Sequence, residues 1–74
     1  MFLYEGQIGN KYRVIDIGID YKLKRRLEVI GFTYRTEVEV LNKNLNGSLI
    51  LKVRGTRFAI SKMIAKKIEV ICNG

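Results

Sequence analysis

The chain has 74 residues, which is enough for one small domain with a thin core. Fourteen lysine and arginine residues against seven acids give a formal net charge of +7, which indicates either a solvated basic surface or an anionic partner. A single cysteine, Cys72, excludes an internal disulfide, and no apolar run approaches the roughly twenty residues that span a bilayer. We therefore expect one cytoplasmic domain over residues 1–74 without membrane insertion.

The N-terminal part of the chain predicts one bent strand. The first eight residues form no clear element, and Leu3 and Ile8 are the candidates there for packing under the core. The segment from Lys11 to Ile19 is rich in β-branched residues, which occur at both odd and even positions and would therefore point to both faces of a strand. A strand of this kind changes its inward face midway, so we expect a bend or a bulge near Asp16.

A short amphipathic helix is predicted from about Tyr21 to Ile30. Asp20 is placed to cap its first turn, because a carboxylate accepts the free amide protons there. Gly31 is placed to end the helix in the left-handed conformation, and Phe32 to pack back onto the last turn. The apolar residues that share the inner face of this helix are Leu23, Leu27 and Ile30.

The polar side of this helix is basic. Lys22 shares a flank with Arg25 and Arg26, and like charges at these spacings cost a few tenths of a kcal/mol each. Two explanations stay open: neutralisation by Glu37 and Glu39 on a neighbouring strand, or an acidic partner.

A β-hairpin is predicted around Asn46-Gly47, the strongest short turn signal in the chain. If these two residues form the loop, Val40 faces Val53 across the strands. The residues that this register turns toward the core are Val38, Val40, Leu49, Leu51 and Val53.

The same register predicts an exposed apolar pair on the outer face of the hairpin. Leu41 falls opposite Lys52 and Ile50 opposite Lys43, so that Leu41 and Ile50 are diagonal neighbours. The charged residues around this pair are Lys43, Lys52, Glu39 and Arg54, with Glu39 facing Arg54. Apolar residues ringed by charge are typical of a small protein interface, with a partner protein or a second copy. The alternative is that a bulge or a shifted loop turns one residue inward, or that the helix covers both.

The remainder of the chain predicts two further strands. Gly55 marks a turn, Thr56 to Ile60 is a strand, and Ser61 is placed to cap a brief turn from Lys62 to Ala65. Ile68 to Ile71 is the closing strand. The expected fold is therefore mostly β with one short helix, a small barrel of about five strands.

The residue inventory indicates a non-catalytic protein. Histidine is missing from the sequence, and the seven acids are scattered. Cys72 has no partner to activate it, and near the C-terminus we expect it to be a packing residue. We expect no catalytic residues, no cofactor and no dedicated metal site. Nucleic-acid binding is the second hypothesis, because small basic barrels often serve it, but Tyr12 and Tyr34 are the only candidates for stacking on bases.

Three segments in order resemble the ferrous iron transport protein A (FeoA) family. They are RRLEVIGFTYRTEVEV at Arg25 to Val40, VRGTRFAIS at Val53 to Ser61, and the closing Ala65, Ile68 and Val70. The resemblance begins near Gly9. It implies an SH3-like barrel, like that of the C-terminal domain of iron-dependent repressors. It also implies an accessory role in ferrous iron uptake, by contact with the cytoplasmic GTP-binding part of the membrane permease FeoB.

The chain departs from the family pattern in two loops. Tyr34-Arg35 stands where the family usually has a proline-glycine pair, and Asn42 to Ser48 stands where it has a segment that contains proline. Loops commonly carry binding contacts, so these departures bear on the partner more than on the fold.

Overall fold

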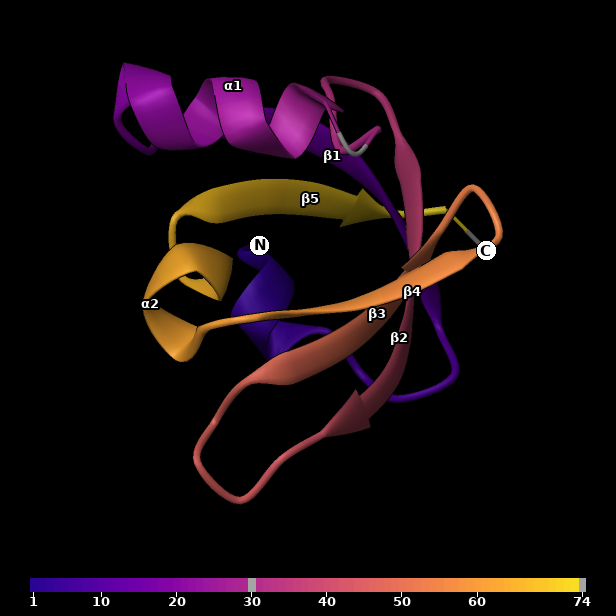
Figure 1. Cartoon of the computed structure of the whole chain (residues 1–74). Helices are drawn as coiled ribbons and strands as arrows, with labels where there is room; N and C mark the ends of the chain where they lie inside the picture. Colours follow the sequence, from indigo (N-terminus) through magenta and orange to yellow (C-terminus); the bar gives the residue numbers. More distant parts are fainter. Residues whose placement is uncertain (30, 74) are drawn as a thin grey trace.

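The computed structural model describes residues 1–29 and 31–73. Figure 1 shows the described chain as a curled sheet with short helices at its ends. Its elements in chain order are the 3₁₀ turn η1 (Leu3–Glu5), β1 (Lys11–Ile17), α1 (Tyr21–Val29), β2 (Glu37–Lys43), β3 (Leu49–Val53), β4 (Thr56–Ile60), α2 (Lys62–Ala65) and β5 (Ile68–Cys72). The predicted five short strands, longer helix and brief second helix are confirmed.

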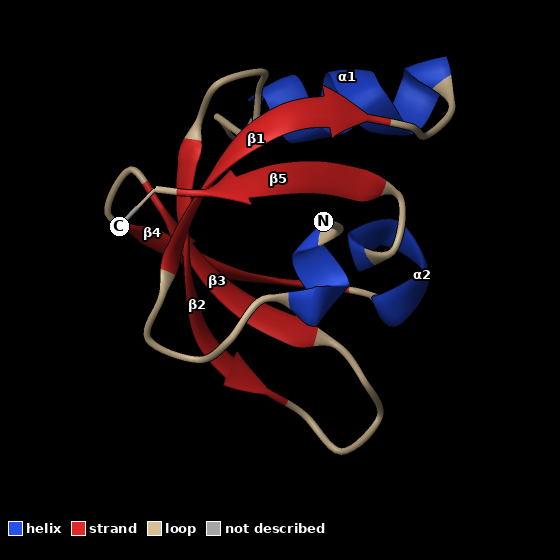
Figure 2. Cartoon of the chain, turned by 180° about the vertical axis from the view of Figure 1, so that it is seen from behind, coloured by secondary structure: helices blue, strands red, loops and turns tan. Residues whose placement is uncertain are grey.

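The five strands form one antiparallel sheet in the order β4-β3-β2-β1-β5. The sheet curls around the core, with β1 and β5 on one side and β2, β3 and β4 on the other (Figures 1 and 2). The N-terminal segment extends the β5 side, because Phe2 bridges Glu69 and the Val70 amide donates to the Met1 carbonyl at 2.7 Å. The register of β1 on β5 shifts between Val14 and Asp16, which confirms the bulge predicted near Asp16.

The core fills the inside of the curled sheet. Apolar side chains alternate inward along each strand, as expected for a sheet with one buried face. All five hairpin residues predicted to face the core are buried. The buried apolar residues are Leu3, Tyr12, Val14, Ile17, Leu27, Phe32, Val38, Val40, Leu49, Leu51, Val53, Ile60, Ala65, Ile68 and Val70.

Helix α1 begins and ends as its sequence predicts. The Leu23 amide donates to the Asp20 carboxylate at 3.0 Å, which is the predicted N-cap. Gly31 has φ +94°, and its amide donates to the Glu28 carbonyl at 3.0 Å. The Phe32 amide donates to the Leu27 carbonyl at 2.8 Å, which completes a Schellman motif. Ile30, predicted to share the inner face, lies outside the described residues.

The predicted two-residue loop at Asn46-Gly47 is wrong. That loop requires positive φ at both residues, whereas Gly47 has φ +91° and Asn46 is not among the residues with positive φ. Instead the Gly47 amide donates to the Asn44 carbonyl at 2.9 Å and the Asn44 amide to the Ser48 carbonyl at 2.8 Å. The loop thus has three residues at its tip, with glycine in the left-handed position.

The longer loop shifts the β2–β3 register by one residue, so that Lys43 pairs with Leu49 instead of Ile50, and a bulge shifts it by one more. Val40 pairs with Leu51 instead of Val53. A bulge at Leu41 then brings Asn42 opposite Ile50. The tight turn with two positive φ angles lies at the next connection, where Arg54 (φ 52°) and Gly55 (φ 82°) join β3 to β4. Gly55 is therefore a turn residue, as predicted.

Two further expectations are wrong. Ile8 is exposed instead of packing under the core, because the N-terminal segment contributes Leu3 there. Cys72, expected to be a packing residue, is exposed at the end of β5.

Candidate partner-binding surface

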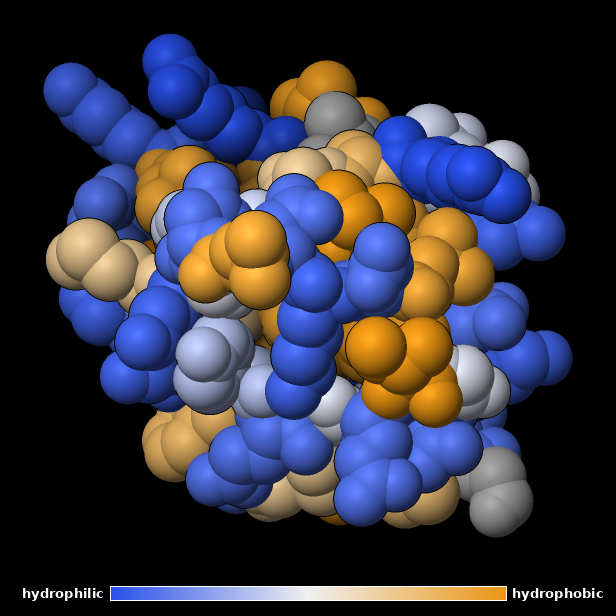
Figure 3. Space-filling model, turned by 90° about the horizontal axis from the view of Figure 1, so that it is seen from below, coloured by the Kyte–Doolittle hydropathy of each residue, from blue (hydrophilic) through white to orange (hydrophobic). Residues whose placement is uncertain are grey.

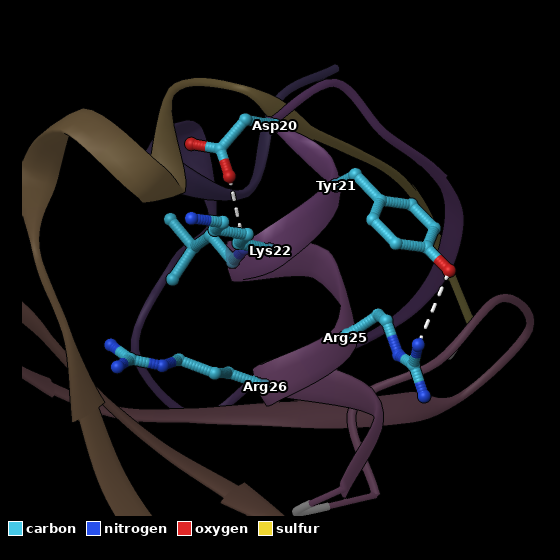
Figure 4. Close-up of a pocket in the computed structure, with 6 residues that line it drawn as sticks. Asp20, Tyr21, Lys22, Arg25 and Arg26 are labelled. Carbon is cyan, nitrogen blue, oxygen red and sulfur yellow. Dashed lines mark hydrogen bonds between the residues drawn. The ribbon is translucent and has the colours of Figure 1, made fainter.

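A shallow hollow lies along the outer side of α1. Its volume is about 720 Å³, and we call it the α1 hollow. Figure 4 shows Lys22 and Arg26 extended to one side of the helix, and Tyr21 and Arg25 to the other. Both pairs are four residues apart, so each forms a ridge along the helix. The residues that line the α1 hollow are Asp20, Tyr21, Lys22, Leu23, Arg25 and Arg26.

The helix presents this face because little of it packs inward. Within α1 only Leu27 is buried, and Leu23 is half-buried at the margin of the hollow. The capping contacts at Asp20 and Gly31 hold the two helix ends. The predicted candidates Lys22, Arg25 and Arg26 therefore all lie on the exposed part of the helix, with Lys22 and Arg26 on one side and Arg25 on the other.

Tyr21 belongs to this surface and was missed by the sequence analysis. Its side chain is 71% exposed, and its hydroxyl accepts a hydrogen bond from Arg25 Nη1 at 3.3 Å. The Arg25 guanidinium also lies 5.7 Å from the Tyr21 ring centroid. The spacing of four residues between an aromatic and an arginine was the available signal. Tyr21 holds one cation of the α1 hollow in place.

The acids proposed to neutralise the helix lie elsewhere. Glu37 is opposite Arg13, and Glu39 lies between Lys11 on β1 and Lys52 on β3. Both acids line a separate hollow of about 270 Å³ together with Lys11, Lys52, Arg54 and Gly55. Their cross-strand neighbours are therefore strand cations, and neither acid lines the α1 hollow.

The predicted pair Leu41 and Ile50 is not assembled as the register implied. Leu41 lies at the bulge and Ile50 opposite Asn42, and both side chains are half-buried. Of the charges expected around them, Lys52 pairs with Glu39 rather than with Leu41. Lys43 pairs with Leu49 and donates its ammonium to the Tyr4 carbonyl at 3.1 Å.

The hairpin side and α1 are separate surfaces. In both views α1 lies at the far end of the barrel from the β2–β3 loop (Figures 1 and 2), so the helix does not cover the loop end of the hairpin. The lower face, toward which this hairpin lies, shows apolar side chains separated by hydrophilic ones (Figure 3).

Within residues 1–29 and 31–73, no group of three or more His, Cys, Asp or Glu side chains could hold a metal ion. In the same part of the chain, no helix has the length and apolarity needed to cross a membrane.

Of the two aromatic candidates for nucleic-acid stacking, Tyr12 is only 2% exposed and belongs to the core. Tyr34 is 61% exposed, with the Arg35 guanidinium 5.8 Å from its ring centroid.

Solved structures with the same fold come from several bacteria. A FeoA protein from Chlorobium tepidum has a TM-score of 0.93 at 21% identity, over 100% of this chain and 71% of that chain. A FeoA-like protein from Clostridium acetobutylicum has a TM-score of 0.84 at 30% identity, over 99% of this chain and 86% of that chain. No curated protein sequence matches this chain.

The description of a third similar structure states its fold. This structure is FeoA from Stenotrophomonas maltophilia in complex with zinc, with a TM-score of 0.78 at 29% identity over 96% of this chain and 89% of that chain. That protein is described as a prokaryotic SH3 domain protein and suggested as a bacterial ferrous iron transport activating factor. The SH3-like barrel implied by the sequence is thus confirmed. The sequence itself matches the FeoA domain over residues 1–72, and the chain therefore belongs to the FeoA family.

Proposed function

We propose that this chain is a non-catalytic accessory protein of ferrous iron uptake. It acts in the cytoplasm by contact with the GTP-binding part of the membrane permease FeoB. Membership of the FeoA family supports the iron-uptake role. The observation that carries action by contact is the α1 hollow, where three exposed cations lie along one helix, while Glu37 and Glu39 line a separate hollow.

The α1 hollow suits an acidic protein surface. Lys22 lies in the first turn, where the helix dipole disfavours a cation, and it is followed by Arg25 and Arg26. Their proximity costs free energy in the isolated chain, and this cost is recovered when an acidic surface docks. Tyr21 and Leu23 add apolar area between the charges.

The test is direct binding of the purified chain to the soluble GTP-binding domain of FeoB from the same organism. Reversing two charges of the α1 hollow, with Arg25→Glu and Arg26→Glu, is expected to weaken binding on the order of tenfold or more. The matched control is Lys24→Glu with Arg57→Glu. Lys24 is on the same helix but does not line the α1 hollow, and the net charge change is identical.

The outcomes separate the partner from the surface. Wild-type protein that fails to bind the domain contradicts FeoB as the partner. Equal weakening by both double variants shows general charge attraction and rejects the α1 hollow as the docking surface. Lys22→Glu serves as a folding check, since an acid in the first turn is expected to stabilise α1 by about 0.3–1 kcal/mol.

Nucleic-acid binding is the second candidate, and the net charge of +7 favours it. The burial of Tyr12 removes one of its two stacking platforms, which leaves Tyr34 alone beside Arg35. We expect the chain to leave a DNA column below physiological ionic strength. Retention above it would favour this candidate over the protein partner.

A further inference from the structure

Three lysines converge on one aromatic ring at the α2 end of the barrel. The Nζ atoms of Lys43, Lys62 and Lys66 each lie 5.4 Å from the ring centroid of Tyr4. Any two of these ammonium groups are therefore within twice that distance of each other. Because the ring has only two faces, at least two of the three share one. We call these four residues the Tyr4 cluster.

Separate elements build the Tyr4 cluster. Tyr4 is in η1, which packs against α2, and it is half-buried against the core. Lys62 and Lys66 are four residues apart and lie on successive turns, since the Lys66 amide donates to the Lys62 carbonyl at 3.0 Å. Lys43 comes from the end of β2, and its Nζ donates to the Tyr4 carbonyl at 3.1 Å. The geometry therefore depends on the tertiary fold rather than on one flexible segment.

The β2–β3 loop closes one side of the cluster. A Cβ built on Gly47 would stand 2.9 Å from Lys62 Cδ and 3.3 Å from Lys62 Cβ. The lysine stem thus runs along the loop where glycine leaves room for it. The packing directs the Lys62 ammonium toward Tyr4 and restricts the positions that it can reach.

The charge around the cluster is one-sided. Residues 40–68 contain seven lysine and arginine residues and no acid, whereas the rest of the chain has seven of each and is neutral. The whole net charge of +7 thus comes from the segment that supplies all three lysines. The Tyr4 ring attracts each ammonium, but it carries no charge to neutralise them. Three like charges held this close raise the local positive potential.

We propose that the Tyr4 cluster is a binding site for a phosphate group. A lysine ammonium is a compact cation with three donors and binds phosphate as a point charge. Three of them arranged around one ring supply several donors to the oxygens of one phosphate, and the dianion neutralises the mutual repulsion of the lysines. If the lysine stems served only to cover the Tyr4 ring, one stem on each face would be enough, and the third lysine would have no role. The phosphate can come from a soluble polyphosphate, such as that of a nucleotide, or from a lipid headgroup.

The test uses inorganic tripolyphosphate as the soluble probe. Titration of the wild-type protein, followed by NMR, is expected to shift the side-chain resonances of Lys43, Lys62 and Lys66 and the ring resonances of Tyr4 together. Replacing the three lysines with glutamine is expected to weaken binding on the order of tenfold for each charge-assisted hydrogen bond to phosphate that is removed. Replacing them with arginine keeps the charges and is expected to retain binding.

The matched control removes three lysines that are outside the cluster, with Lys11→Gln, Lys24→Gln and Lys52→Gln. It lowers the net charge equally and is expected to retain tripolyphosphate binding within a few-fold. Equal weakening in the control and the cluster variant would show attraction by net charge alone and overturn the proposal. Absence of the joint shifts in the wild-type protein would overturn it as well, whether or not the glutamine variant folds.

The source of the phosphate is separated by vesicle binding. Vesicles of phosphatidylcholine alone are compared with vesicles of phosphatidylcholine mixed with phosphatidylglycerol. Retention on the mixed vesicles that the glutamine variant loses and the control keeps assigns the site to lipid headgroups. Tripolyphosphate binding without such retention assigns it to a soluble phosphate compound.

Discussion

The Arg54 side chain lies against the backbone of Gly31, so that a Cβ built on Gly31 would stand 3.3 Å from Arg54 Cδ. Both residues have positive φ, +94° at Gly31 and 52° at Arg54. The end of α1 and the turn between β3 and β4 thus meet at two left-handed residues. Two positions far apart in the sequence are therefore constrained by both backbone conformation and contact.

The first prediction concerns Gly31. Gly31→Val places a branched side chain at positive φ and against Arg54, so we expect the free energy of unfolding to fall by about 1–2 kcal/mol or more. In so small a domain this lowers the melting temperature by several degrees. Thermal melts of Gly31→Ala and Gly55→Ala separate the two causes. Gly55 has φ +82° and nothing within 4 Å of a built Cβ, so only the backbone term applies there. A Gly31→Val variant as stable as the parent contradicts a helix end at this glycine.

The second prediction concerns Arg54. A non-glycine residue in the left-handed region is strained, and asparagine tolerates that region better than arginine does. Arg54→Asn is therefore expected to raise the free energy of unfolding by a part of the roughly 1–3 kcal/mol that a strained left-handed residue costs, as measured by denaturant titration. Arg57→Asn, on the following strand, removes the same charge without relieving a strained turn and is expected to be slightly destabilising. A lower stability of Arg54→Asn would show that the packing against Gly31 outweighs the strain.

The third prediction concerns Leu41 and Ile50. Both are half-buried, and lysine stems can cover the same area while their ammonium groups reach water. The double change to lysine is expected to keep the fold and lower the free energy of unfolding by about 2 kcal/mol. Leu51→Lys, at a fully buried position, is expected to unfold the protein. If the α1 hollow is the docking surface, the double variant keeps its affinity for FeoB. A double variant that folds but does not bind FeoB would show that the docking surface lies on the hairpin and not at the α1 hollow.

The fourth prediction concerns metal. Among the described residues the acids and Cys72 do not converge, so we expect no stoichiometric Fe²⁺ binding beyond the weak association of scattered carboxylates. Anaerobic calorimetry measures this. A one-to-one site in the micromolar range would contradict action by contact alone.

The strands were predictable from local patterns, but their pairing was not. Alternation along β2 and β3 identifies Val40 and Leu51 as inward regardless of register, because a shift of two residues preserves the face. The register depends on the length of the loop at Asn46 and on the bulge at Leu41, and an Asn-Gly sequence is compatible with both a two-residue and a three-residue loop. The outer face was therefore predicted less well than the core.

The helix was predictable at both ends because its signals are local. Asp20 and Gly31 act within one turn of themselves, through the N-cap and the left-handed C-terminus. The Tyr4 cluster has no such signal, since Tyr4 and Lys43 are brought together only by tertiary packing. The only signal for this cluster in the sequence is that residues 40–68 contain no acid.

The pairing of β1 with β5 has a consequence for the order in which the protein folds during synthesis. Tyr12 pairs with Cys72, so one edge of β1 stays without its partner until β5 has left the ribosome. Until then the β2–β3–β4 meander, joined by short local turns, can form first, while Val14 and Ile17 remain without their cross-strand neighbours Val70 and Ile68. During that interval the unpaired edge of β1 is available for pairing with other chains, and the synthesis of β5 ends the interval.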